Sequence, residues 1–274
     1  MSEPRPYELY AIRYATAKRE ARDVFIGGDP HRGIVTMDYF VWVARNDSHT
    51  VVIDTGFDAA AAQRRRRQLL LEPGDGLRLL GIDCAQVKHV IITHLHYDHA
   101  GNLQIFPRAR FYLQEREIAF ATGRHMAHPF FAQAYDLEGV LSMVRLVYGA
   151  QVQFYDGDAA IVPGITVHHV GGHTHGLQVV RVWTRVGWMV LASDAAHYLA
   201  NMSSGRPFPI VADVTQMTAG WDRLRELASG PEWIVPGHDP LVMQRYREPE
   251  PGLRGVIVRL DAEPHGGLDG TFQR

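Results

Sequence analysis

The stretch Thr93-His94-Leu95-His96-Tyr97-Asp98-His99 follows directly after an apolar run at residues 87–92. The run is bounded by polar residues, which is typical of a strand buried on both faces. The stretch would then lie on a loop at the end of that strand and offer three imidazoles and one carboxylate. A helix could not turn all four inward, because its 3.6-residue period would spread them around its circumference. A loop that gathers these groups therefore decides how the rest of the chain is interpreted.

Nitrogen and oxygen donors at this density suit zinc or a similar divalent ion. On a tight loop entering a helix, His94 and His96 can converge on one ion while Asp98 and His99 face another. The alternative is a polar loop whose histidines are merely solvated. Closely spaced basic groups and a carboxylate at a buried strand end need a partner to be stable, so we favour the metal site.

Three further potential ligands each come just past a predicted strand. They are His173 after residues 165–170, Asp194 after residues 188–192 and His238 after residues 233–235. Any one alone would more often be an ordinary core or turn residue, but together with the 93–99 loop they predict a two-metal site. The small neighbours Gly172 and Gly237 would let the backbone come close to an ion.

The composition agrees with a metal bound through nitrogen and oxygen. The 274 residues include 15 histidines but one cysteine, Cys84, which excludes an internal disulfide and a thiolate-rich zinc site. Lys and Arg number 28 against 30 Asp and Glu, and this balance argues against a nucleic-acid or anionic-membrane partner. Neither an export signal nor an apolar run of about 20 residues is present, so we expect a cytoplasmic protein.

Short apolar runs alternate with helical patterns along the chain. We expect strands at residues 7–14, 38–44, 50–54, 87–92, 110–114, 151–155, 165–170, 177–185, 188–192, 233–235 and 255–260. We expect helices at residues 59–71, 115–122 and 215–228. The pattern predicts a mixed α/β or α+β fold as one domain over residues 1–274. Residues 115–148 would form a helical, cap-like insertion, and the chain would be loose from about residue 263.

Four consecutive arginines occupy residues 64–67 of the predicted helix at 59–71, which Pro73-Gly74 would end. They could form an anion-binding patch. We instead expect a solvated helix face whose side-chain stems lie over apolar surface.

These motifs resemble those of the metallo-β-lactamase superfamily. HLHYDH at residues 94–99, His173, Asp194 and His238 match its metal motifs, and Asp54 in VVIDTG matches its early Asp-Thr-Gly turn. The resemblance covers roughly residues 38–240. It implies an α+β fold, the αβ/βα four-layer sandwich of two packed mixed β-sheets flanked by helices. Within the superfamily, the chain is most similar to the N-acyl-homoserine lactonases and related lactone hydrolases.

The resemblance also implies a role for each ligand. His94, His96 and His173 would hold the first metal, Asp98, His99 and His238 the second, and Asp194 would bridge the two. Asp54 would orient a ligand without binding metal. A glutamate in place of His96 would suggest a redox di-iron protein, and true β-lactamases place Cys or Ser where this chain has Asp194. Both differences favour a non-redox hydrolase that does not act on antibiotics.

The reaction implied is the opening of a lactone ester, with an N-acyl homoserine lactone or another small lactone as substrate. Two zinc ions would share a hydroxide that attacks the carbonyl carbon, and Asp98 would deliver a proton to the leaving oxygen. Lactonases of this type usually carry a tyrosine three residues after the bridging aspartate. His197 stands there in this chain, so either His197 or the adjacent Tyr198 would contact the lactone carbonyl.

Substrate contacts are expected from Tyr97 and from a cap that includes His125, His128 and Phe130. Other carbonyl hydrolases use the same kind of site, namely a thioesterase of the glyoxalase II type or a cyclic amide hydrolase. A phosphodiesterase is less favoured, because the chain lacks a basic, aromatic-interleaved stretch. A homodimer is possible by analogy with related enzymes.

Overall fold

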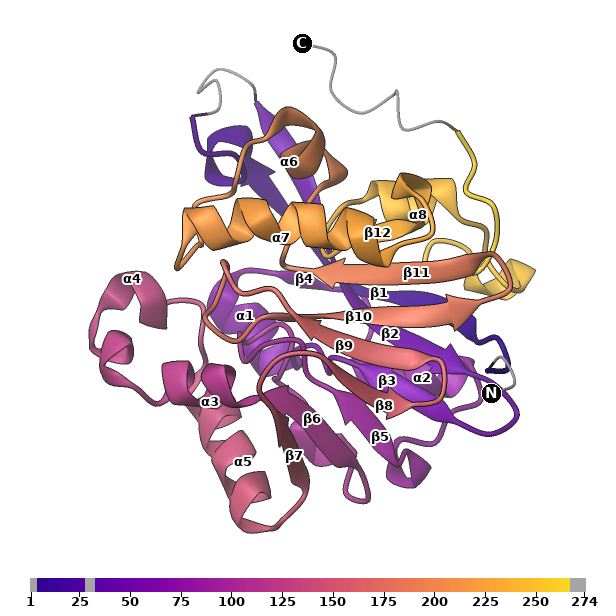
Figure 1. The fold of residues 1–274 in the computed structure, drawn as a ribbon, viewed down its shortest axis with the longest axis horizontal. Helices are drawn as coiled ribbons and strands as arrows, with labels where there is room; N and C mark the ends of the chain where they lie inside the picture. The colour runs from indigo at the N-terminus through magenta and orange to yellow at the C-terminus, as the bar shows by residue number, and fades with distance from the viewer. Residues whose placement is uncertain (1–3, 28–32, 267–274) are drawn as a thin grey trace.

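Two β-sheets pack face to face, and helices cover both outer faces (Figure 1). The structure is a computed structural model that describes residues 4–27 and 33–266. In order, the first sheet contains β13 (Ile257–Arg259), β1 (Glu8–Glu20), β2 (Ile34–Arg45), β3 (Thr50–Ile53), β5 (His89–Ile91), β6 (Arg110–Gln114) and β7 (Val152–Tyr155), with β4 (Gln68–Leu69) also paired to β1. The second contains β12 (Ile234–Pro236), β11 (Gly187–Ser193), β10 (Gln178–Thr184), β9 (Ile165–His169) and β8 (Ala159–Val162).

Both sheets are mixed. The first is antiparallel from β13 to β3 and parallel from β3 to β7, whereas in the second only β11 and β12 run parallel among the pairs formed by described residues. The helices are α1 (Ala59–Arg65), α2 (Pro73–Leu79), α3 (Glu115–Ala121), α4 (Pro129–Ala132), α5 (Leu137–Tyr148), α6 (Leu199–Ser204), α7 (Val214–Leu227) and α8 (Leu241–Arg245). The expected α+β architecture of two mixed sheets flanked by helices is confirmed.

The alternation of side chains along the strands builds the layers. On β1, Leu9 and Ala11 point into the apolar core between the two sheets, which also contains Trp42 of β2. Tyr10 and Ile12, one position along, point into a second core beneath the helices on the outer face of the first sheet. A third core on the outer face of the second sheet is closed by α7. Each sheet is therefore buried on both faces over much of its area, which explains the continuous apolar runs.

Paired parallel strands end at the same edge of a sheet, so the segments that follow them begin close together. Ile53 lies beside Ile91 in the parallel pair β3–β5, so Asp54 and the 93–99 loop emerge together. Ser193 lies beside Pro236 in the parallel pair β11–β12, so Asp194 and His238 also emerge together. The hydroxyl of Ser193 donates to the hydroxyl of Thr93 over 2.9 Å and joins the two edges. Four sequence motifs are thus brought together by the ends of strands.

The predicted helix at residues 59–71 is wrong in its second half. α1 ends at Arg65, Arg66 adopts a left-handed conformation with φ of 53°, and residues 68–69 pair with β1 as β4. Pro73 does not stop a helix but starts α2, since proline at the first helical position has no amide hydrogen to leave unpaired. β8, α2, α6 and α8 were not predicted, because each is too short to show a clear period. β1 and β2 extend well beyond the predicted ranges.

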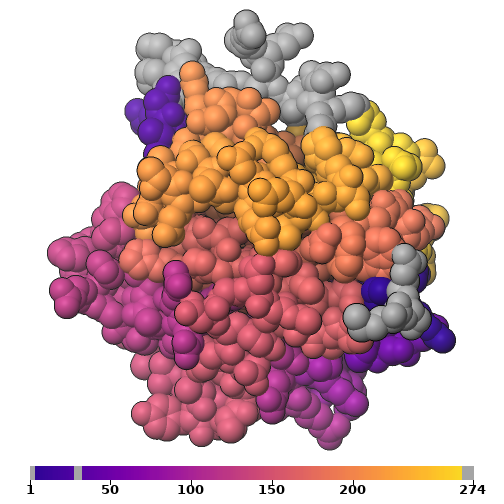
Figure 2. Space-filling view, viewed as in Figure 1, coloured from indigo at the N-terminus to yellow at the C-terminus, as the bar shows by residue number. Residues whose placement is uncertain are grey.

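The helices predicted at 115–122 and 215–228 correspond to α3 and α7. Residues 115–148 contain α3, α4 and α5, which lie at the left of Figures 1 and 2. Val140 and Met143 of α5 join the outer core of the first sheet, so this part of the expected cap packs on the body of the protein. Of the tail expected to be loose from about residue 263, residues 267–274 lie outside the described residues. Among the described residues, no helix is both long and apolar enough to span a membrane.

The left-handed turn at Arg66 predicts a stabilising substitution. Because a β-carbon disfavours this conformation, Arg66→Gly should raise the free energy of unfolding by about 0.5–1 kcal/mol in urea titrations. The control Gln63→Gly, at an exposed helical position of α1, should lower it by a similar amount. Equal effects of the two substitutions would contradict a strained turn.

Candidate metal centre

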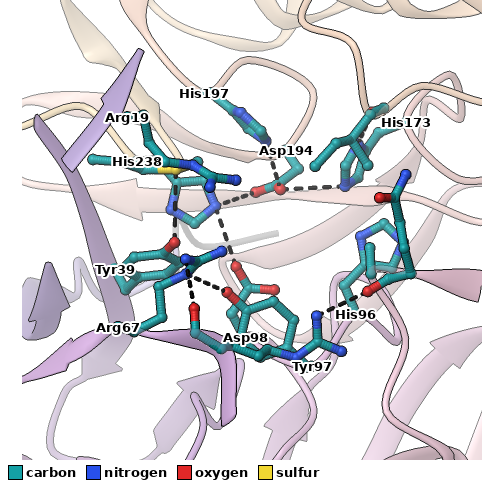
Figure 3. Close-up of a pocket in the computed structure, with 15 residues that line it drawn as sticks. Arg19, Tyr39, Arg67, His96, Tyr97, Asp98, His173, Asp194, His197 and His238 are labelled. Atoms are coloured by element: carbon teal, nitrogen blue, oxygen red, sulfur yellow. Dashed lines mark hydrogen bonds and ion pairs between the residues drawn. The ribbon is translucent and has the colours of Figure 1, made fainter. Parts of the chain in front are cut away.

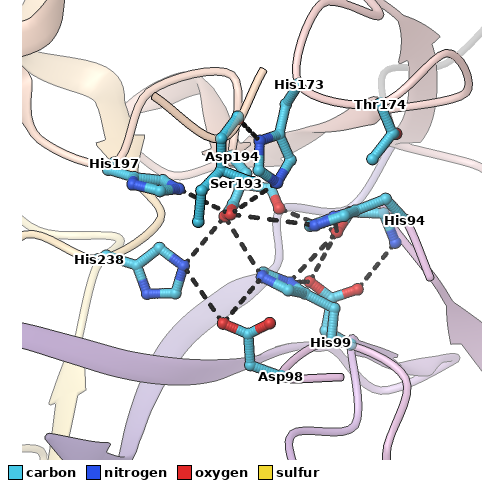
Figure 4. A network of polar contacts seen from close by, with 12 residues as sticks. His94, Asp98, His99, His173, Thr174, Ser193, Asp194, His197 and His238 are labelled. Atoms are coloured by element: carbon cyan, nitrogen blue, oxygen red, sulfur yellow. Dashed lines mark hydrogen bonds and ion pairs between the residues drawn. The ribbon is translucent and has the colours of Figure 1, made fainter. Parts of the chain in front are cut away.

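The carboxylate of Asp194 lies at the centre of a cluster of buried imidazoles (Figure 4). Its Oδ2 is 3.2 Å from Nε2 of His173 and 3.9 Å from Nε2 of His94. Its Oδ1 is 3.3 Å from Nε2 of His99 and 3.1 Å from Nε2 of His238. Each oxygen of the one carboxylate therefore faces a different pair of histidines.

The remaining expected ligands complete these two groups. His94, His96 and His173 bring one ligand atom each within 4.8 Å of one another, and Asp98, His99 and His238 do the same. The Oδ2 atom of Asp98 is 3.9 Å from Nε2 of His99 and 3.8 Å from Nε2 of His238. The structure thus brings together all seven residues that the sequence proposed as ligands.

The other ring nitrogen of four histidines is held by the protein, and this fixes which nitrogen faces the centre. Nδ1 pairs with the Thr93 hydroxyl in His94, with Asp54 in His99, with the carbonyl of Ile210 in His173 and with the carbonyl of Asp38 in His238. The Nε2 atoms of all four are buried and have no hydrogen-bond partner among residues 4–27 and 33–266, and neither does Oδ1 of Asp194. Buried polar atoms are rarely left unpaired. A pair of divalent cations would satisfy these atoms, so the residues fit the expected metals.

Asp54 lies behind the ligands. Its carboxylate accepts hydrogen bonds from the amide and the hydroxyl of Thr93, at 2.7 and 2.8 Å, and lies 2.7 Å from Nδ1 of His99. A left-handed backbone at Asp54, with φ of 61°, allows the side chain to reach back in this way. Asp54 therefore holds the His99 ring and the start of the loop, and its role behind a metal ligand stays a prediction.

The two small neighbours, Gly172 and Gly237, allow close packing within the protein. A β-carbon on Gly172 would lie 2.5 Å from the backbone nitrogen of Met217, and one on Gly237 would lie 2.5 Å from the carbonyl oxygen of Ser193. These glycines let two backbone segments pack closely together. A β-carbon on Gly237 would also lie 2.8 Å from Oδ1 of Asp194, so an approach of the backbone to an ion stays a prediction.

A buried carboxylate that the sequence did not reveal ties two ligand loops together. Glu117 of α3 accepts hydrogen bonds from the amide of Leu95 and the hydroxyl of Tyr135 on one oxygen, and from the hydroxyl of Thr174 and the amide of Gly176 on the other. Burial raises the pKa of Glu117 even though these donors oppose it. The side chain therefore fixes the loop that carries His94 and His96 against the loop that carries His173. Its one sequence signal was an isolated acid on an otherwise apolar helix face.

The charges of the cluster divide the histidines into two kinds. Burial, reinforced by neighbouring imidazoles, lowers the pKa values of His94 and His96 well below the usual value. Burial acts the same way on His99 and His238, but nearby carboxylates, chiefly that of Asp194, outweigh it and raise their pKa values. The same histidines hold the pKa of Asp194 well below its usual value against the effect of burial. Metal ions would therefore meet neutral imidazoles at His94 and His96 and compete with protons at His99 and His238.

His197 and Tyr198, the two candidates for contact with a lactone carbonyl, separate in the structure. His197 is near Asp194, with its Nε2 2.9 Å from Oδ2, and its ring stacks on Phe208 at a centroid distance of 3.4 Å. The hydroxyl of Tyr198 instead donates to the carbonyl of Thr36, and Tyr198 is not among the residues that line the pocket at the cluster.

That pocket encloses about 120 Å³ and opens beside the cluster (Figure 3). Its described lining residues are Arg19, Met37, Tyr39, Arg65, Arg67, His96, Tyr97, Asp98, Gln133, Ala134, His173, Asp194, His197, Ile210 and His238. Tyr97 contributes to it as expected. His125 lies in a separate depression with Phe120 and His175, and Phe130 is 54% exposed. Neither of these, nor the exposed His128, lines the pocket, so the structure does not place the expected cap residues at the cluster.

Half of the arginine run was misinterpreted. Arg64 and Arg66 are exposed, as a solvated face requires, but Arg65 and Arg67 are partly buried and line the pocket. The left-handed turn at Arg66 redirects the chain toward the pocket, and no helical period could have shown this. Arg19 and Tyr39 were also missed as lining residues. Arg19 lies in the part of β1 that extends beyond the predicted strand at 7–14, and Tyr39 lies in the predicted strand at 38–44, to which no function was assigned.

The family of the chain follows from its sequence and its fold together. Residues 36–238 match the family model of the metallo-beta-lactamase superfamily, and the protein belongs to this superfamily. The expected resemblance and fold are both confirmed.

Similar proteins include several lactonases. N-acyl homoserine lactonase AttM of Agrobacterium fabrum is 30% identical over 179 residues, which cover 64% of this chain and 66% of AttM, just under two thirds of its length. N-acyl homoserine lactonase AiiB of the same organism is 31% identical, with 60% of each chain covered. A quorum-quenching N-acyl homoserine lactone lactonase has the same fold, with a TM-score of 0.73, 21% identity and coverage of 86% of this chain and 94% of that one. The dizinc lactonase AidC, in complex with a product, has a TM-score of 0.70, 16% identity and coverage of 87% and 90%.

The four hydrogen bonds to Glu117 predict that it controls metal affinity from a distance. In Glu117→Gln, the amide nitrogen cannot accept, so two donors lose their partner and the two ligand loops loosen. We expect a loss of about 1–3 kcal/mol of stability and about 10–100-fold weaker zinc binding, measured by competition with a chelator. The control Glu115→Gln, exposed on the same helix, should leave zinc affinity unchanged. Unaltered affinity in Glu117→Gln would show that the loops hold their positions without this carboxylate.

Proposed function

We propose that the protein is a dinuclear, zinc-dependent hydrolase that opens the ester bond of a lactone. The observation that carries the proposal is the carboxylate of Asp194, which presents one oxygen to His94 and His173 and the other to His99 and His238. This is the arrangement that a ligand bridging two cations requires. The lactonases among the similar proteins support a lactone as the substrate class.

Each of the two groups of ligands would hold one metal. His94, His96 and His173 form the first group, Asp98, His99 and His238 form the second, and Asp194 is shared. When bound, two divalent ions supply an activated water at neutral pH and polarise the carbonyl that it attacks. The tightly held imidazoles and the buried surroundings keep this charge in a fixed geometry of low dielectric.

Asp98 is our candidate for proton delivery to the leaving oxygen. It lines the pocket, and its carboxylate faces His99 and His238 on the side away from the first group. The hydroxyl of Tyr14 donates to the backbone carbonyl of Asp98 over 2.8 Å and fixes the residue in place. A carboxylate within reach of the leaving oxygen can pass on a proton taken up earlier in the reaction.

His197 acts through Asp194. Its Nε2 is already engaged with the carboxylate, so it cannot donate that hydrogen to a lactone carbonyl. Burial lowers the pKa of His197 to about 3, and the imidazole is therefore neutral at working pH. The neutral ring stacks on Phe208, donates one hydrogen bond to Asp194 and fixes the orientation of the shared carboxylate.

Tyr97 provides a rigid wall for the substrate. Its ring stacks on that of Phe57 at a centroid distance of 5.4 Å, and Cζ of Arg65 lies over the Tyr97 ring, 3.8 Å from its centroid. Its position in the pocket lining suits contact with the substrate next to the metals.

The cytoplasmic location, the lack of nucleic-acid and membrane partners and the possible homodimer stay predictions.

Removal of the shared carboxylate tests the dinuclear centre. Asp194→Ala should lose at least one equivalent of zinc after dialysis, measured by elemental analysis, and at least about 1,000-fold in kcat/KM. The control Asp222→Ala, on the exposed face of α7, should keep both its metal and its activity. Turnover that survives in Asp194→Ala would remove the bridging role.

Side-by-side kinetics test the substrate class. The zinc-loaded protein should hydrolyse five-membered lactones at least about 100-fold more efficiently than a thioester, a cyclic amide or a phosphodiester, because the proteins similar to it include N-acyl homoserine lactonases. Stopped-flow or pH-stat assays give kcat/KM for each compound. A zinc-loaded sample that prefers the thioester would replace the lactonase proposal by the thioesterase alternative.

A further inference from the structure

Three guanidinium groups line the same pocket as the metal ligands. Arg19 comes from β1, Arg65 from the last turn of α1, and Arg67 from the residues after the left-handed turn (Figure 3). Two separate segments of the chain thus deliver positive charge to one small cavity. Because arginine stays protonated at any physiological pH, all three carry a full charge there.

Two of the three are held in place by neutral partners. Arg65 donates to the backbone carbonyls of Gln133 and Tyr135, each over 2.8 Å. Arg67 donates to the hydroxyl of Tyr97 over 3.0 Å and to the carbonyl of Arg65 over 2.8 Å. These bonds fix the guanidinium planes without neutralising them.

Arg19 is less satisfied still. Its Nε atom is buried and has no hydrogen-bond partner among the described residues. Its guanidinium points toward the interior of the pocket in Figure 3. A buried, unpaired donor costs free energy, which a ligand that accepts a hydrogen bond would recover.

Among the described lining residues, no carboxylate pairs with these three arginines. Among the described residues, none of the three arginines forms an ion pair, although Arg64 of the same run pairs with Asp136. The carboxylates in the described lining are Asp98 and Asp194, and the proposed function assigns both to the metals. Two divalent ions would add further positive charge. The pocket therefore has an excess of positive charge that an anionic ligand would balance.

Aliphatic side chains are few among the described residues that line the pocket. Met37, Ala134 and Ile210 are its aliphatic members, and the cavity of about 120 Å³ is also shared with the metal site. A long acyl chain would need an extended apolar groove, whereas a compact substrate with a charged group matches what is there.

We infer that the substrate is a small lactone that carries a carboxylate, whose ring carbonyl lies at the metal centre and whose carboxylate is bound by Arg19 and Arg67. This inference rests on the proposed lactone hydrolysis and narrows its substrate. The planar forks of guanidinium groups match the two oxygens of a carboxylate. Arg67 uses Nε and Nη1 in its bonds to Tyr97 and Arg65, so its Nη2 is the nitrogen that would meet the carboxylate. Arg65 already donates from both Nη1 and Nη2 to backbone carbonyls, and it adds charge and supports Tyr97.

The test compares a five-membered lactone that has a carboxylate on its ring with the methyl ester of the same compound. The zinc-loaded wild type should prefer the carboxylate by at least about tenfold in kcat/KM. Arg19→Gln and Arg67→Gln should each reduce this preference about tenfold, mainly through a higher KM for the carboxylate, and Arg19→Lys should restore part of it. The preference should also shrink as salt rises from 0.05 to 0.5 M, about a threefold fall in Debye length.

Arg66→Gln is the matched control, because Arg66 belongs to the same run but is exposed and outside the pocket lining. It should leave the preference unchanged. Zinc content is measured for every variant, so that a loss of metal is not mistaken for a loss of anion binding. Equal rates for the two lactones in the wild type, or an undiminished preference in both pocket variants, would overturn the inference and leave lactone hydrolysis intact.

Calorimetry separates this outcome from a failure of the proposed function. If the zinc-loaded protein opens neither lactone, the proposed function is wrong, and binding of the ring-opened hydroxy dicarboxylate is compared with binding of its monomethyl ester. At least about tenfold tighter binding of the dicarboxylate, lost in Arg19→Gln, would still support an anion subsite. Equal affinities, or no binding of either compound, would overturn it.

Discussion

The convergence of buried imidazoles on a single carboxylate is the constraint on which the rest of this molecule depends. Four Nε2 atoms and one oxygen of Asp194 lie in the interior without a hydrogen-bond partner in the described part of the chain. Such an arrangement is costly unless cations occupy its centre. Several features outside the cluster, including the Asp54 network and the four bonds to Glu117, serve to keep these atoms where they are.

The two sheets make this convergence possible through the direction of their strands. Parallel pairs occur where ligands are needed, at β3–β5 in one sheet and at β11–β12 in the other. The packing of the sheets then sets these two edges against each other, joined by the hydrogen bond between Ser193 and Thr93. Asp54 and Ser193 have left-handed backbone conformations, which turn the chain toward the cluster directly after each strand. The surrounding contacts hold these less favourable conformations in place. Fold stability and site geometry therefore share the same contacts.

Positive charge near the cluster adds a second level of organisation. The metal ligands define a chemistry that many members of a superfamily can share, whereas the residues around them decide what enters. In this chain, the last turn of α1 places Arg65 in the pocket and the turn at Arg66 brings Arg67 there, while Arg64 and Arg66 face solvent. A backbone feature of one residue thus alters the electrostatic character of the entire cavity.

The sequence alone determined the strand-end positions of the ligands, most of the strands, the helices α3 and α7 and the identity of all seven residues that gather at the centre. These depend on local apolar runs and on residue types at short spacing, which a linear pattern records. The tertiary structure decided what the pattern could not: that Arg67 lines the pocket, that Tyr198 is held by Thr36, that His197 bonds to Asp194 and that Glu117 joins two loops. Each of these depends on where a side chain meets a segment distant in sequence or on a single left-handed residue, and neither leaves a period in the sequence.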